Sequence, residues 1–92
     1  MLFRSEPDWA VYSLGTTGEL NADYTLEETS EISLRVFSLD GKQVYELQAG
    51  RQDAGTHRVV ILPGKNYSST GLFIVQLTVD HMAYSKKSIV VN

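Results

Sequence analysis

The stretch of residues 69–92 constrains the fold more than any other part of the sequence. It contains two runs of apolar, β-branched and aromatic residues, 72–79 and 83–91, separated by a short polar break at Asp80 and His81. Two β-favouring runs with so little between them predict an antiparallel hairpin. The first run carries apolar residues on both faces near its start, which predicts a strand inside a sheet and not at its rim.

Alternation and one turn dipeptide dominate the preceding part of the chain. Apolar and polar residues alternate with a period of two along residues 20–27 and again along residues 31–37. This pattern is typical of strands with one buried and one solvated face. The dipeptide Asp40-Gly41 follows, and it is the strongest local signal because it tolerates the positive φ angles of tight hairpin turns. Residues 44–47 are therefore expected to fold back against the preceding strand.

Turn signals divide the chain into seven strand candidates, at the spacing of roughly 8–12 residues that is typical of a sandwich. The candidates are residues 9–14, 20–27, 31–37, 44–47, 57–62, 72–79 and 83–91. Loops are expected at residues 15–18, 49–55 and 63–70, and Gly41, Gly55 and Gly71 are expected to serve turns. No segment shows sustained helical periodicity. We therefore predict an all-β fold, a small antiparallel Ig-like β-sandwich of about seven strands.

Length and composition are those of one globular domain. The chain has 92 residues, of which 42% are hydrophobic and 21% charged, so it has room for a single core and is not expected to be disordered. It has no cysteine, which excludes disulfides and thiolate metal sites. No run approaches the roughly 18 apolar residues of a membrane-spanning helix. The first residues lack the basic-then-apolar order of a signal peptide, so the chain is either cytoplasmic or a piece of a longer protein, and we favour the second.

Charge is distributed unevenly along the chain. Residues 1–40 hold eight acidic and two basic residues, a net charge of −6, whereas residues 41–92 hold six basic and three acidic residues, a net charge of +3. Such polarity would orient a charged partner, although a solvated surface explains it equally well. The basic residues are scattered and have no interleaved aromatic residues, which argues against nucleic-acid binding.

No set of residues has the spacing of a catalytic or metal-binding motif. His57 begins a predicted strand and His81 lies in a predicted turn, and we interpret both as surface residues. The acidic residues of segment 27–31 lie at a strand end, where solvation explains them better than acid–base chemistry does. Asp40 alone does not supply the several oxygen ligands that calcium requires. We predict that the domain is not an enzyme and has no metal or cofactor.

The aromatic residues are compatible with a binding function as well as with a structural one. Carbohydrate-binding modules stack sugar rings on exposed aromatic faces, and Phe37 falls on the polar face of its predicted strand. Aromatic residues also fill the core of a two-sheet fold and cover cross-strand neighbours. A carbohydrate- or protein-binding sandwich therefore stands as an alternative function, next to a structural Ig-like spacer.

Four segments in fixed order carry a family resemblance. They are residues 32–44 (ISLRVFSLDGKQV), 53–57 (DAGTH), 69–77 (STGLFIVQL) and 85–92 (SKKSIVVN). Together they resemble the type A C-terminal sorting domain of the Bacteroidetes type IX (Por) secretion system. The chain lacks the Tyr-Pro-Asn-Pro-like opening element of that family, and Phe73 stands where tyrosine is common. A weaker similarity exists to the Ig-like domain of flagellar hook-capping proteins.

The resemblance implies a passive role in protein transport. It implies a single domain at the C-terminus of a longer secreted or outer-membrane-associated protein, exported through the periplasm to the cell surface or medium. Its implied partners are the type IX translocon, which recognises the domain, and a sortase-like peptidase, which in many members removes it and attaches the cargo to the surface.

The last strand is the expected recognition element. Its residues are Lys86, Lys87, Ser88, Ile89, Val90, Val91 and Asn92. Such a strand offers backbone groups for strand addition and positive charge for an acidic partner. Alternatively, Lys86 and Lys87 protect an edge strand from aggregation. An open edge would also permit a strand-exchange dimer.

Overall fold

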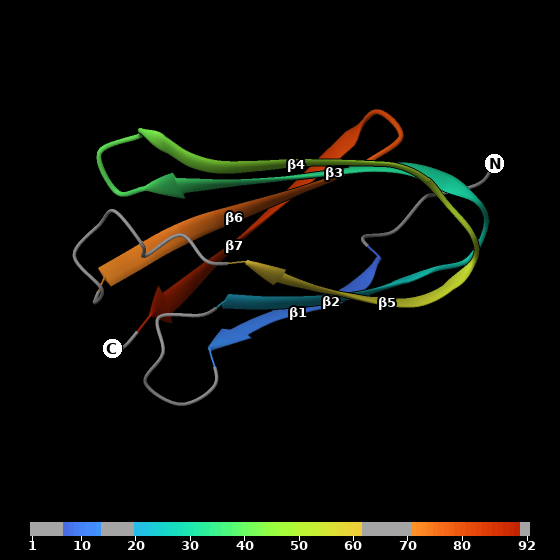
Figure 1. Cartoon of the computed structure of the whole chain (residues 1–92), viewed down its shortest axis with the longest axis horizontal. Coiled ribbons are helices and arrows are strands. Elements are labelled where there is room, and N and C mark those ends of the chain that lie inside the picture. The colour runs from blue at the N-terminus through green and yellow to red at the C-terminus, as the bar shows by residue number, and fades with distance from the viewer. Residues whose placement is uncertain (1–6, 14–19, 62–70, 91–92) are drawn as a thin grey trace, which may run out of the picture.

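The computed structural model describes residues 7–13, 20–61 and 71–90, and in these ranges the chain forms seven β-strands (Figure 1). They are β1 (Asp8–Ser13), β2 (Leu20–Leu26), β3 (Ser30–Ser38), β4 (Gln43–Gln52), β5 (Gly55–Ile61), β6 (Gly71–Val79) and β7 (Met82–Val90). The strands make two antiparallel sheets, in the orders β1-β2-β5 and β4-β3-β6-β7. The predicted antiparallel sandwich is confirmed.

Two bent ribbons connect the sheets at one end of the sandwich. Residues 27–29 lead from β2 to β3, and beside them Asp53 and Ala54 lead from β4 to β5 (Figure 1). Because β2 pairs with β5 and β3 pairs with β4, the two ribbons cross from one sheet to the other together. In an immunoglobulin constant domain the fourth strand joins the sheet of the first two, whereas here β4 lies beside β3.

The prediction of a loop over residues 49–55 is wrong, because most of this segment belongs to β4. β4 continues through Gln52, and its last residues pair with the start of β3, up to the contact of Ser30 with Gln52. A register shift between Ile32 and Ser33 and a φ of +75° at Gly50 let this strand bend and continue. Gly50 therefore serves a bulge within a strand, and only two residues separate β4 from β5.

Alternating residues of the central strands meet between the sheets and form the core. The buried apolar side chains of β2, β3 and β6 are Leu20, Ala22, Tyr24 and Leu26, then Ile32, Leu34 and Val36, then Phe73, Val75, Leu77 and Val79. Trp9 of β1 and Ile61 of β5 complete the cluster. The strand predicted at residues 72–79 is confirmed as an interior strand, since β6 lies between β3 and β7.

The turn at Asp40-Gly41 joins β3 to β4, as predicted. The Gly41 amide donates to the Ser38 carbonyl at 3.0 Å, and Gly41 has a φ of +88°, in the left-handed region that favours glycine. The Asp40 carboxylate accepts hydrogen bonds from the Ser38 hydroxyl and from the Lys42 amide. These bonds, the Ser38 hydroxyl first, lower the pKa of Asp40 below its ordinary value of 3.8.

Asp80 and His81 form the turn between β6 and β7, which confirms the predicted hairpin. Asp80 has a φ of +56°, which short polar side chains tolerate better than most. Its amide donates to the Glu31 carbonyl at 2.8 Å, and its Oδ1 accepts from the Glu31 amide at 2.9 Å. The turn is thus tied to the first residues of β3.

Gly55 and Gly71, expected to serve turns, are the first residues of β5 and β6.

Candidate functional site

The predicted recognition strand is β7, which lies at the edge of the four-stranded sheet and pairs with β6. Lys86 is opposite the buried Val75, and its Nζ lies 5.3 Å from the centroid of the Trp9 ring, in cation–π contact. Lys87 is opposite Ile74 on the outer face and is exposed. The two lysines therefore point to opposite faces of the strand, and a partner on the outer face would meet Lys87.

Of the other residues of the expected recognition segment, the structure describes the strand pairing as far as Val90. Ser88 is buried and lies opposite Phe73. Ile89 and Val90 belong to β7 and pair with Leu72 and Gly71. Val91 and Asn92 lie outside the described residues.

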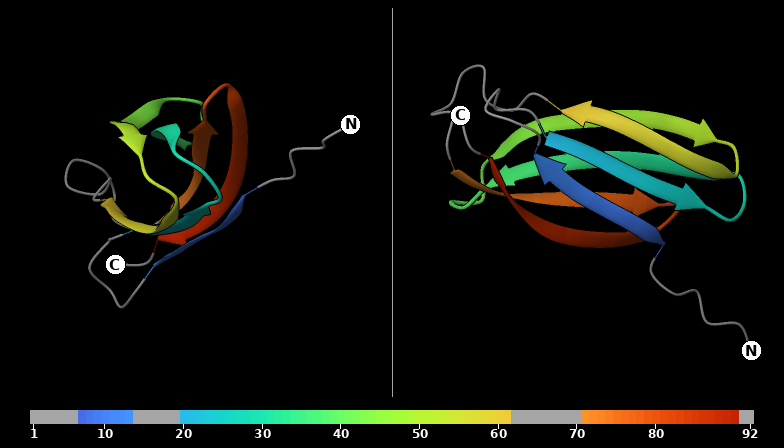
Figure 2. Two further views of the ribbon diagram at one scale, coloured as in Figure 1. Left: turned by 90° about the vertical axis from the view of Figure 1, so that its right-hand side faces the viewer. Right: turned by 90° about the horizontal axis from the view of Figure 1, so that it is seen from below.

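The contact between Lys86 and Trp9 joins the two sheets along one side of the sandwich. β1 and β7 are edge strands of different sheets and lie side by side (Figure 2). Lys86 reaches across this seam, so that its ammonium group meets the Trp9 ring of the other sheet. An inward-pointing lysine on an edge strand also opposes pairing with another chain. This geometry supports the protective interpretation for Lys86.

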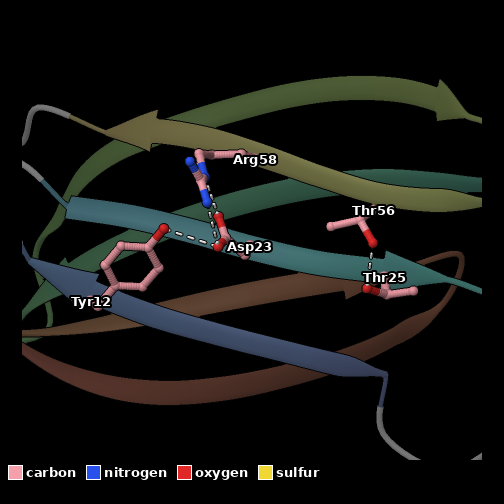
Figure 3. A network of polar contacts seen from close by, with 5 residues as sticks. All are labelled: Tyr12, Asp23, Thr25, Thr56 and Arg58. Atoms are coloured by element: carbon pink, nitrogen blue, oxygen red, sulfur yellow. Dashed lines mark hydrogen bonds and ion pairs between the residues drawn. The ribbon is translucent and has the colours of Figure 1, made fainter.

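A polar network that the sequence patterns did not predict lies on the outer face of the three-stranded sheet (Figure 3). Arg58 of β5 contacts the Asp23 carboxylate through Nε at 2.9 Å and Nη2 at 3.3 Å. The Tyr12 hydroxyl of β1 donates to the same carboxylate at 2.9 Å. Alternation places Asp23 outward, but only the pairing of β2 with β5 reveals its partner. A carboxylate bound in this way is a poor general base, because its lone pairs are occupied.

This network makes the stability of the fold depend on pH. The hydrogen bond from Arg58, followed by that from Tyr12, lowers the pKa of Asp23 below its ordinary value of 3.8. A carboxyl whose pKa is lower in the folded state stabilises the fold above its unfolded pKa and loses that effect as pH falls through its folded pKa. We expect Asp23→Asn to reduce the loss of stability that occurs as pH falls through the pKa of Asp23. Urea unfolding of both proteins at several pH values measures this effect.

Arg58→Met is the companion variant, because it removes the main cause of the shift while keeping the carboxyl. It should also flatten the acid limb of the stability profile. An Asp23→Asn protein with the same pH dependence as the original chain would contradict the expectation.

The outer face of the four-stranded sheet carries Phe37. A cross-strand row runs over this face through Gln43, Phe37, Ile74 and Lys87, one residue from each strand. Phe37 and Ile74 are both half-buried. We call these four residues the outer row. Arg35 and Glu46 form an ion pair at 3.2 Å in the neighbouring row, so the apolar part of this face is bordered by charge.

The two histidines occupy different parts of the fold, His57 in β5 and His81 in the β6–β7 turn. The ring of His57 stacks on Tyr24 with centroids 5.4 Å apart, and its Nε2 lies 2.8 Å from the Asp53 carbonyl oxygen. His81 is exposed in the β6–β7 turn, and Glu31 pairs with Asp80 through its backbone. Over residues 7–13, 20–61 and 71–90, no three histidine or carboxylate side chains are grouped as metal ligands.

Comparison with known proteins assigns no family. No protein-family model, curated protein or solved structure matches the chain. Within the part of the chain that the structure describes, no helix is long and apolar enough to cross a membrane.

Proposed function

We propose that this domain is a secretion signal of the type IX kind, read by an outer-membrane translocon that exports an upstream cargo. The observation that supports this proposal is that three of the four resembling segments contribute to the four-stranded sheet, whereas residues 53–57 lead into β5 of the other sheet. Residues 32–44 contribute to β3 and β4, residues 69–77 to β6, and residues 85–92 to β7. In this proposal the translocon and a sortase-like peptidase perform the chemistry, and the domain supplies the surface that they recognise.

Lys87 is the side chain that we expect an acidic site of the translocon to contact. It is exposed on the outer face of β7, whereas Lys86 is held against Trp9. A charge at the rim of an interface steers association and selects the partner, and its reversal repels that partner. Lys86 then has a positioning role, because it keeps β7 against β1.

Export of a reporter tests the proposal. Residues 1–92 are fused behind a signal peptide and a reporter protein in a host with a type IX system; the whole chain is needed because Trp9 belongs to the core. We expect the reporter in the medium or on the cell surface. Lys87→Glu should retain it in the periplasm without changing the melting temperature of the isolated domain.

Ser85→Glu is the matched control, because Ser85 is exposed on the same strand and the same outer face. This variant should be exported normally. Periplasmic retention of the unmodified fusion would refute the secretion signal. Export of the Lys87→Glu fusion at the normal level would refute the role of Lys87 but not the secretion signal.

A second function is favoured by the outer row, where Phe37 offers an aromatic surface beside Ile74 and Gln43. Aromatic faces bordered by polar groups are suited to stacking with sugars. Titration with a panel of glycans tests this carbohydrate-binding alternative. Binding that disappears in Phe37→Ala supports it, and the absence of any binding removes it.

A further inference from the structure

The four sheet edges of this sandwich differ in how they resist pairing with another chain. β1 and β7 lie against each other, and Lys86 of β7 reaches across to the Trp9 ring of β1. β4 has two register shifts against β3, and such bulges disrupt an edge for further pairing. β5 has neither device. Its register with β2 is unbroken from Leu20 opposite Ile61 to Leu26 opposite Gly55, and β2 is its only partner among the described strands.

The free edge of β5 also carries no uncompensated charge. Arg58 is the only charged side chain of the strand, and it is bound to Asp23. Its side chain lies toward β2, away from the free edge (Figure 3). Val60, on the same face, is 50% exposed. A regular edge strand with exposed apolar surface and a neutralised charge is suited to strand addition.

We infer that the free edge of β5 pairs antiparallel with β5 of a second copy, so that two three-stranded sheets become one sheet of six strands. Self-pairing about a two-fold axis matches equal lengths of strand and gives a closed dimer. In an antiparallel pair, residues opposite each other lie on the same face of the sheet. The two-fold axis between two β5 strands therefore passes beside one residue, which lies opposite the same residue of the second copy. An axis at Arg58 would place two guanidinium groups opposite each other, whereas an axis at Val59 places Arg58 opposite Val60. Packing of the β-branched Val59 against its own copy favours this axis, because such cross-strand pairs stabilise a sheet, and this inference does not rest on the proposed function.

Single cysteines locate the axis, since the chain has no cysteine of its own. Under mild oxidation or with a short bismaleimide, Val59→Cys should cross-link to itself, because directly opposite Cβ atoms lie about 4.5–5.5 Å apart. Thr56→Cys is the control on the same strand and should remain uncross-linked. Cross-linking of Arg58→Cys instead of Val59→Cys would overturn this register, and cross-linking of none of the three would overturn the β5 interface.

Sedimentation equilibrium of the full chain measures the dimer without covalent chemistry. Val60→Lys adds charge to the β5 edge and should raise the dimer dissociation constant about tenfold or more. Leu39→Lys is the matched control, since Leu39 is 64% exposed and lies in the β3–β4 turn; it should leave the dimer intact. A chain that stays monomeric up to about millimolar concentration, or equal weakening by both variants, would overturn the proposal.

Discussion

Replacing Trp9 with alanine is expected to lower the free energy of unfolding by about 3–5 kcal/mol, the usual loss for a buried tryptophan. Trp9 is 5% exposed and belongs to the core, and its ring also supports Lys86 of the neighbouring sheet. The substitution leaves a cavity at the seam between β1 and β7 and removes the surface on which the ammonium group rests. A domain of this size is stable by only about 5–14 kcal/mol, so the loss is a large part of the total.

Urea unfolding followed by circular dichroism measures this loss. Lys86→Met is the comparison variant, because it removes the charge but keeps an apolar stem over the ring. Exposed cation–π contacts contribute about 0.5–1 kcal/mol, so Lys86→Met should cost much less than Trp9→Ala. Similar losses for the two variants would show that the charge, and not the buried ring, stabilises the seam.

Replacing Tyr24 with alanine is expected to cost a similar amount, about 3–5 kcal/mol, as for other large aromatic residues in cores. Tyr24 is 1% exposed, stacks on His57, and donates its hydroxyl to Oε1 of Gln52. These contacts link β2, β5 and β4 where the bent ribbons pass between the sheets. Loss of the ring therefore weakens both sheets together.

Tyr24→Phe separates the hydroxyl from the ring. It keeps the packing but leaves the Gln52 amide without this donor, at an expected cost of about 1 kcal/mol, or a melting temperature about 4–8 °C lower. Burial also raises the pKa of Tyr24 above 10.0. The contribution of the neutral Tyr24 hydroxyl to stability is therefore lost as pH rises through the folded pKa of Tyr24. The phenylalanine variant should lack this alkaline transition. Equal losses for Tyr24→Phe and Tyr24→Ala would contradict the importance of the ring.

Local patterns were sufficient to predict most of the strands and both hairpin turns. Period-two alternation marks β2 and β3 because one face of each meets the core. The dipeptide Asp40-Gly41 marks its turn because glycine accepts the positive φ found there. The pattern failed at residues 49–55, where glycines normally indicate a loop. Pairing with β3 extends β4 through this segment, and that pairing cannot be read from local sequence.

The antiparallel sandwich, the interior position of β6 and the closing hairpin follow from local patterns, because burial and turn geometry act through neighbouring residues. How β7 presents its two lysines depends on packing between the sheets, since the aromatic partner of Lys86 is Trp9, near the other end of the sequence. The pairing of β2 with β5 likewise brings Asp23 to Arg58 across 35 positions and leaves β5 with a regular free edge. Register and edge exposure depend on contacts between distant segments, and one-dimensional patterns do not encode which segments will meet.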